Sequence, residues 1–193
     1  LARKLWDARN YAGGSHVKAW NNVAKVAEAE LASVAESATV RPIRLPTVEE
    51  VREAIIAANT NVRVDACEAG SGADTVQLPA GSFVLTIAGA GEDESATGDL
   101  DVTEDLTVEG ASLITTSISG NNLDRAFEVL SNSHLTLTHL TVEGGSGAVG
   151  GLGGAIRVND GGALALATAR VRDTAADTAP AVYAATGATV SLY

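Results

Sequence analysis

A short β-strand pattern that returns at nearly constant spacing is the feature that most limits how this chain can fold. The first set comprises three apolar–polar–apolar triplets, at 127–129, 135–137 and 140–142. The set returns 29 positions later and begins again 26 positions after that, at 182–184 and 190–192. Three short strands per repeat, joined by Gly, Asn and Asp, are typical of a coil that stacks on its neighbours and buries a ladder of side chains. The spacing therefore predicts a mainly β chain, folded as a right-handed parallel β-helix.

The composition suits stacked ladders of aliphatic side chains. Of the 193 residues 46% are hydrophobic, but only 4% are aromatic and Met is absent, so Val, Leu, Ile and Ala must build the core. The 20 glycines indicate many tight corners. The length is enough for one domain, or for a solenoid with a cap.

The charge pattern disfavours some classes of function. The net charge is −11 at pH 7, which argues against a nucleic-acid partner because counterion release needs clustered Lys and Arg. The sequence has no apolar run that approaches the roughly 20 residues needed to span a bilayer. The single cysteine, Cys67, cannot form an internal disulfide. Because the chain begins at Leu1 rather than Met, we expect a processed or excised piece.

Residues 1–46 differ from the rest and are expected to form a helical extension with a linker. An amphipathic helix is predicted over about 17–38, with apolar residues at helical spacing: Val17, Trp20, Val23, Ala24, Ala27, Leu31 and Val34. Pro42 and Pro46 predict an extended linker, since Pro biases the preceding residue away from the α region. We expect the helix to dock on the open end of the β-helix or on another subunit.

A second helix is predicted at the start of the remaining segment, 47–193. Thr47 has N-cap chemistry and Glu50 stands three positions later, which is the spacing of a capping box. An apolar stripe then continues to a predicted end near Asn59. We interpret 47–193 as this capping helix followed by the parallel β-helix.

The two ends of the predicted β-helix differ. Its first strands are expected at 75–78 and 82–86, after the capping helix. Its last residues, 190–193, lie within a repeat, so we expect an uncapped coil there. An open strand edge invites pairing with another chain. This end is therefore expected to continue into further coils or to meet a partner.

Five segments of 47–193 follow one another in the order known from a family of modules: Arg52–Asn59, Gly72–Gly81, Gly98–Val102, Leu106–Gly110 and Asp124–Phe127. In these segments the chain resembles the CSLREA domain, which begins many bacterial secreted and surface β-helix proteins. The resemblance implies a right-handed β-helix with a helical cap, exported and surface-attached. It brings no established catalytic residues to carry over.

Two positions depart from that family's pattern. The cysteine that gives the motif its name falls at Glu49, and Cys67 stands where many relatives place a second cysteine. The cap disulfide that the resemblance implies therefore cannot form. Residues 1–40 match no part of the family pattern.

Arginines near carboxylates raise the possibility of a polysaccharide lyase. Arg170, Arg172, Asp173 and Asp177 lie close together in sequence, and an Arg beside acidic, cation-binding residues suits proton abstraction next to a uronate carboxylate. The 29-residue spacing, however, places Arg172 above Glu143 of the previous coil. An exposed ion pair between coils is the favoured interpretation.

An acidic segment offers oxygen ligands for calcium. Its carboxylates are Glu92, Asp93, Glu94, Asp99 and Asp101. They lack the spacing of an EF-hand and the nonapeptide repeat of calcium-binding β-rolls. We favour a solvated acidic loop over 92–101, with weak calcium binding as the alternative.

The histidines and the cysteine show no spacing typical of a metal site. His16, His134 and His139 are scattered, and the last two are expected to point outwards. Cys67 has no basic partner nearby in sequence, so a free or buried thiol is favoured over a nucleophile.

Glycine and asparagine mark the expected corners and insertions. Gly144–Gly154 has no Gly-Lys-Ser/Thr element and is interpreted as a flexible insertion between coils. Asn121, Asn122 and Asn159 are expected at corners, because Asn tolerates a left-handed backbone.

These features together predict a non-catalytic extracellular module with a structural or adhesive role at the cell surface, and not an enzyme. No catalytic, cofactor or metal-ligating residues are assigned. The expected partner is another copy of the chain, joined end to end through the N-terminal helix and the open C-terminal coil, or a different cell-surface protein, with a glycan as a further possibility. The alternative is a carbohydrate-binding or lyase-like β-helix. Few aromatics fall in the predicted coils for sugar stacking: Phe83, Phe127 and Tyr183.

Overall fold

The computed structural model describes residues 46–147, 152–172, 174 and 181–193. The chain divides into two units, Leu1–Arg44 and Leu45–Tyr193, and all the described residues belong to the second. The predictions for the first 45 residues, including the helix over 17–38, lie outside the described part.

The described unit is a parallel β-solenoid of about four turns, preceded by one short helix. Its strands form three sheets in which every neighbouring pair is parallel. The first sheet contains β1 (Asp74–Leu78), β4 (Asp105–Gly110), β7 (His134–Thr138), β10 (Ala163–Ala167) and β13 (Thr189–Leu192). The second contains β2 (Gly81–Val84), β5 (Thr116–Ser119), β8 (Thr141–Glu143) and β11 (Arg170–Arg172). The third contains β3 (Leu100–Val102), β6 (Phe127–Val129), β9 (Ile156–Val158) and β12 (Val182–Ala184).

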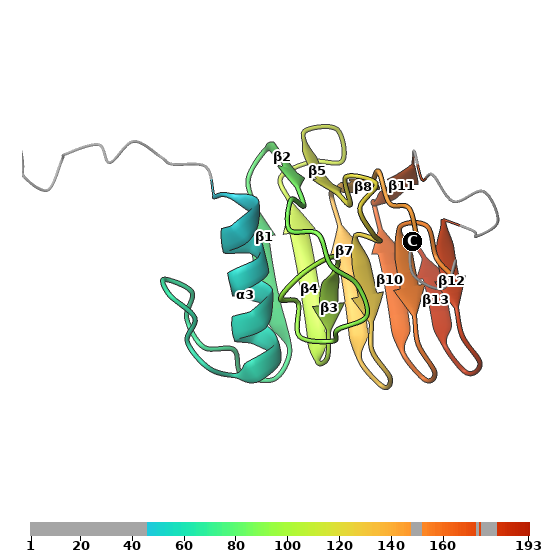
Figure 1. Ribbon diagram of the computed structural model, residues 1–193, viewed down its shortest axis with the longest axis horizontal. Helices are drawn as coiled ribbons and strands as arrows, with labels where there is room; N and C mark the ends of the chain where they lie inside the picture. Colours follow the sequence, from blue (N-terminus) through green and yellow to red (C-terminus); the bar gives the residue numbers. More distant parts are fainter. Residues whose placement is uncertain (1–45, 148–151, 173, 175–180) are drawn as a thin grey trace, which may run out of the picture. The chain divides into compact units, whose positions relative to one another are not determined.

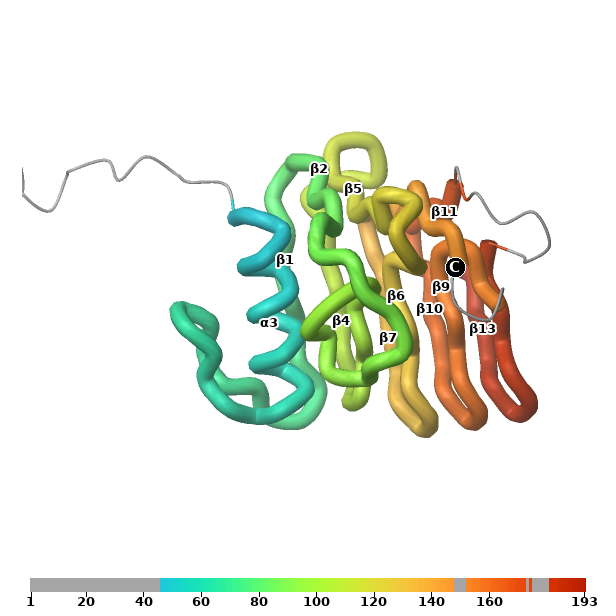
Figure 2. Tube along the Cα trace, in the orientation of Figure 1, coloured from blue at the N-terminus to red at the C-terminus, as the bar shows by residue number. Residues whose placement is uncertain are grey.

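Each turn of the solenoid gives one strand to each sheet, and the turns follow one another along the stack (Figures 1 and 2). The predicted spacing of 29 positions is confirmed, because Phe127 pairs with Ile156 and Leu135 with Leu164. The next spacing of 26 is confirmed by the pairing of Leu164 with Val190. The mainly β solenoid was therefore predictable from the repeat.

The core consists of aliphatic ladders between the sheets. In the first sheet Leu106, Leu135 and Leu164 stack in register and are at most 4% exposed. Core side chains also stack in register in the third sheet, where Leu100 pairs with Phe127. Fully burying a side chain of this size stabilises the fold by about 1.5–3 kcal/mol. The ladders therefore supply cohesion from turn to turn.

Helix α3 (Val48–Thr60) packs against β1 and β3 at one end of the stack (Figure 1). Its predicted capping box is confirmed, because the Thr47 backbone N–H donates to the Glu50 carboxylate at 2.6 Å and the Glu50 N–H donates to the Thr47 hydroxyl. The helix buries Val51 and Ile55 against the first turn. It therefore covers strand edges and core side chains that would otherwise face water.

The predicted corner residues adopt the expected backbone in part. Asn121 and Asn122 have left-handed φ values of 55° and 54°. Asn159 does not share this conformation, and its side chain instead donates to the Glu128 carboxylate at 2.8 Å.

In the predicted insertion, a Cβ at Gly145 would lie 2.0 Å from the Gly154 carbonyl oxygen, so two backbone segments pass close to each other there. Residues 148–151 of that segment lie outside the described part.

Candidate functional site

Two acidic residues occupy the middle positions of strands in the third sheet. Leu100 and Val102 of β3 point into the core, so strand alternation directs Asp101 to the outer face. Glu128 of β6 lies directly beside Asp101 in register. Two carboxylates on neighbouring parallel strands are about one strand spacing apart, roughly 4.8 Å, and repel each other when both are ionised.

A loop covers this outer face and removes the carboxylates from water. Residues 91–99, hereafter the covering loop, lead directly into β3. Asp101 is 0% exposed, Asp99 2% and Glu128 6%. The prediction of a solvated acidic loop is therefore wrong for Asp99 and Asp101. It failed because the loop folds back over the sheet instead of extending into solvent.

Ser95 fastens the covering loop to β3 through both its backbone and its side chain. Its N–H donates to Asp101 Oδ2 at 2.8 Å. Its hydroxyl donates to the Asp101 carbonyl oxygen at 3.0 Å and accepts from the Asp101 N–H at 2.7 Å. These bonds fix the direction of the Asp101 carboxylate.

Glu92 organises the start of the covering loop. Its carboxylate accepts hydrogen bonds from the backbone N–H groups of Glu94, Ala96 and Thr97. Partial burial disfavours the charge, but these donors outweigh it and lower the pKa of Glu92. Glu92 therefore acts within the loop, while the neighbouring Asp93 and Glu94 are exposed.

Two buried arginines hold the cluster together. Arg125 Nε donates to Asp99 Oδ2 at 3.0 Å, and Arg125 Nη2 donates to Glu128 Oε2. Burial disfavours the charge of Arg125, but the surrounding carboxylates outweigh it and raise its pKa. Arg52 of α3 donates to the carbonyl oxygens of Ser95, Gly98 and Asp99 at 2.7–3.0 Å. Arg52 therefore joins the capping helix to the covering loop.

Burial makes ionisation of the cluster's aspartates unfavourable. Desolvation, with a further contribution from the Asp99 charge, raises the pKa of Asp101 to about 8. Desolvation also raises the pKa of Asp99 to about 6, although the Arg125 guanidinium opposes this. Both aspartates therefore hold a proton more readily than an exposed carboxyl group does.

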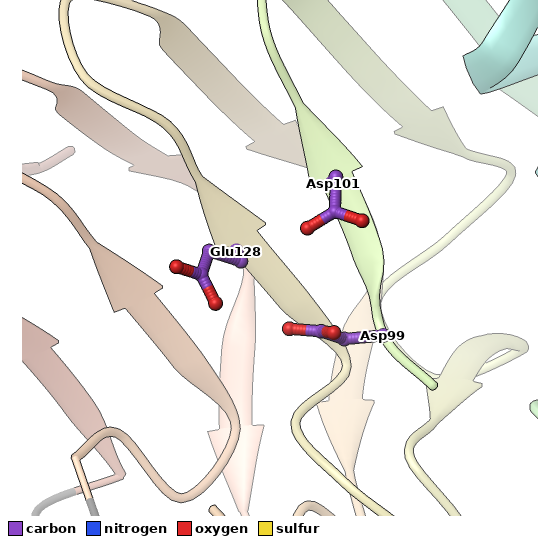
Figure 3. Close-up of side chains that lie close together, drawn as sticks. All are labelled: Asp99, Asp101 and Glu128. Carbon is purple, nitrogen blue, oxygen red and sulfur yellow. The ribbon is translucent and has the colours of Figure 1, made fainter. Parts of the chain in front are cut away.

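The geometry brings three carboxylates around one point. One oxygen from each of Asp99, Asp101 and Glu128 lies within 4.8 Å of the others. Figure 3 shows the three side chains facing a common space, with one oxygen of Asp101 directed between the other two carboxylates. Asp101 Oδ1 has no hydrogen-bond partner in the described part of the chain.

Sequence reasoning considered Asp99 and Asp101 as oxygen ligands only in the alternative of weak calcium binding, and it missed Glu128, Arg125 and Arg52. A signal for Glu128 was present, because Leu100–Val102 pairs with Phe127–Val129 at a spacing of 27 positions. Aligning the triplet Leu100–Val102 with Phe127–Val129 would have placed Asp101 beside Glu128. The arginines carried no comparable signal in the repeat.

The residues considered for a lyase reaction are arranged as the favoured interpretation predicted. Arg172 pairs with Glu143 in register, and its Nη2 lies 2.6 Å from Glu143 Oε2. Arg170 is exposed on the same strand, while Asp173 and Asp177 lie outside the described residues. The carbohydrate-binding or lyase-like alternative stays a prediction. Turnover of an acidic polysaccharide by the wild type, abolished in Arg170→Ala, would support the lyase activity.

The remaining candidates lie apart from the cluster. His134 and His139 are exposed, as predicted; His134 Nδ1 lies 2.6 Å from Asp105 Oδ1 on the neighbouring strand. His16 lies outside the described residues. Cys67 is a free thiol, as predicted, and burial together with nearby Glu charges raises its pKa. Neither arrangement indicates a reactive centre.

No family model, curated protein or solved structure matches this chain. The resemblance to the CSLREA domain therefore stays a prediction that depends on the five segments named above. Within the described residues, no helix has the length and apolar character needed to cross a membrane.

Proposed function

We propose that this chain is a non-catalytic structural module, in which a stiff β-helix serves as a support or adhesive surface outside the cell. The stack of parallel strands supports this role, because every turn is joined to the next in all three sheets. Main-chain pairing of this kind resists bending and pulling along the stack. The resemblance of five segments to CSLREA proteins supports the location, which recovery of the chain in the surface fraction of its source cells would test.

The outer face of the first sheet suits the binding of a partner surface better than catalysis. Its outward positions form a row of short side chains from turn to turn: Thr75, Thr107, Thr136, Ala165 and Ser191. A concavity of about 400 Å³ lies at the end of β1 and β4. The two polar side chains that line it, Gln77 and Glu109, are hydrogen-bonded to each other at 3.3 Å. Such a surface offers repeated polar contacts.

The observation that carries the proposed assembly is the edge strand β13. In the described residues β13 pairs with β10 on one side only, at the end of the sheet. Val190 and Leu192 continue the ladders of Leu164 and Leu166, yet they are 41% and 75% exposed. An unpaired parallel edge with exposed ladder residues is a template for another strand. We infer that further strands cover this edge; where no further turn of the same chain does so, a second copy of the chain pairs with it.

Sedimentation velocity over a range of concentrations tests this assembly. The wild-type chain is expected to form larger species as concentration rises, and Leu192→Lys should shift it towards monomer by placing charge on the edge. Val62→Lys is the matched control, because Val62 is 60% exposed in a loop away from β13. A wild-type chain that stays monomeric throughout, or equal association of both variants, would contradict the proposed interface.

A further inference from the structure

We propose that Asp99, Asp101 and Glu128 bind a calcium ion beneath the covering loop. Their nearest oxygens lie within 4.8 Å of one another. Calcium–oxygen distances are about 2.3–2.6 Å, so two ligands on opposite sides of one ion are separated by roughly twice that distance. Three oxygens no more than 4.8 Å apart share a point at most about 2.8 Å from each, so small side-chain movements bring all three to calcium–oxygen distance.

The Asp101 side chain gives independent support for a ligand. It is 0% exposed, and its Oδ1 has no hydrogen-bond partner among the described residues. Its other oxygen accepts a hydrogen bond from the Ser95 N–H, and the Asp101 carboxylate faces the side chains of Asp99 and Glu128 (Figure 3). Buried carboxylate oxygens are normally paired, because leaving one unpaired away from water is costly. A cation at the centre of the three carboxylates would satisfy this oxygen.

The balance of charge points in the same direction. The carboxylate of Asp124, also buried, lies beside this group, and its Oδ2 is likewise unpaired in the described structure. Arg125 donates to Asp99 and Glu128, while Arg52 directs its donors at backbone carbonyl oxygens. Arg157 lies 3.7 Å from Glu128 on the next turn and is partly exposed. Four buried carboxylates thus lie near two buried guanidinium groups, of which Arg125 bonds to Asp99 and Glu128.

The donor set favours calcium over other common cations. The three ligands are carboxylate oxygens, with neither sulfur nor imidazole, which suits a hard ion better than zinc. Magnesium requires near-octahedral geometry with distances of about 2.0–2.1 Å, and it dehydrates reluctantly. Calcium accepts wider and less regular arrangements of oxygens. Bound there, it would tie the covering loop to β3 and β6 and, through Arg52, to α3.

Thermal unfolding with and without calcium tests this site. Full-length protein is freed of metal with a chelator, exchanged into chelator-free buffer at pH 8, and melted in increasing CaCl₂ or MgCl₂. The midpoint should rise by about 5–10 °C when free calcium exceeds its dissociation constant a hundredfold, and less with magnesium. Titration calorimetry on the same protein should give one calcium ion per chain.

Two variants separate the proposed site from the exposed acids. Asp101→Asn keeps the shape and the Ser95 contact but removes the charge, so it should fold and lose the calcium response. Asp93→Asn removes an exposed charge of the covering loop and should respond like wild type. A wild type with neither a midpoint shift nor binding heat would overturn the proposal and leave Asp101 with a proton instead. An equal response from both variants would also overturn it, by placing calcium elsewhere.

Discussion

At the scale of single residues, the least ordinary feature of this chain is an aspartate in the middle of a buried strand face. Asp101 stands where the repeat expects an outward polar side chain, but the covering loop makes it 0% exposed. Three hydrogen bonds with Ser95 hold it in place. These bonds satisfy its backbone and one carboxylate oxygen, while Oδ1 is unpaired in the described structure. The consequence is a carboxyl group whose charge depends on what else is bound.

In the presence of a chelator, the stability of the fold should fall as pH rises from about 4 to about 8. The pKa of Asp101 is raised from 3.8 to about 8 in the folded state, so over this range the folded chain holds a proton that the unfolded chain has lost. Between pH 6 and 8 the free energy of unfolding should drop by on the order of 1 kcal/mol per pH unit. Asp99, with its pKa raised to about 6, adds to the loss at lower pH. Urea unfolding at pH 5, 6.5 and 8 measures this slope.

The Asp101→Asn variant provides the control for this pH dependence. It lacks the titrating group, so its free energy of unfolding should be nearly constant between pH 6 and 8. Stability of the wild type that increases with pH in this window would contradict the assignment. An unchanged slope in the variant would show that another group is responsible.

At the scale of helices and strands, the ladders and the cap are separate sources of stability. The ladders are periodic, so the strands from Phe127 onward could be predicted from the spacing of apolar residues alone. The capping helix was predictable from Thr47 and Glu50, because capping is a local effect. The buried cluster was not predictable in this way. Arg52 bonds to residues 43 to 47 positions away, and periodicity contains no information about such contacts.

Shortening one ladder residue should reveal how much the stack depends on it. Leu137 is 0% exposed and stacks between Val108 and Leu166. Leu137→Ala should lower the free energy of unfolding by about 2–5 kcal/mol, because it leaves a cavity in a close-packed ladder. Leu137→Asp should prevent folding, since it places an unpaired charge in the core. Urea unfolding followed by circular dichroism measures both effects.

Thr136→Ala is the matched control for the ladder variants. Thr136 precedes Leu137 on β7 but points outwards and is half-buried. Its replacement should change the free energy of unfolding by less than about 1 kcal/mol. Cooperative unfolding of Leu137→Asp at the wild-type midpoint would contradict the assignment of Leu137 to the core.

At the scale of the whole molecule, a stable stack of turns has an exposed edge strand, β13, in its first sheet. The turns are held together by main-chain pairing and by ladders, and α3 covers the strands at one end. At β13 the ladders continue into exposed Val190 and Leu192. The repeat predicted this arrangement in outline, because residues 190–192 align with a ladder strand of the preceding turn. Periodicity does not specify what covers this edge.

Electron microscopy of the protein isolated from its source, at near-native concentration, tests the structural role most directly. We expect filaments or ordered arrays in which the strands of one copy continue those of the next. We also expect that Leu192→Lys gives discrete particles under the same conditions, because charge on the β13 edge opposes pairing. Single, unassociated particles of the wild-type protein at the highest concentration would contradict the account.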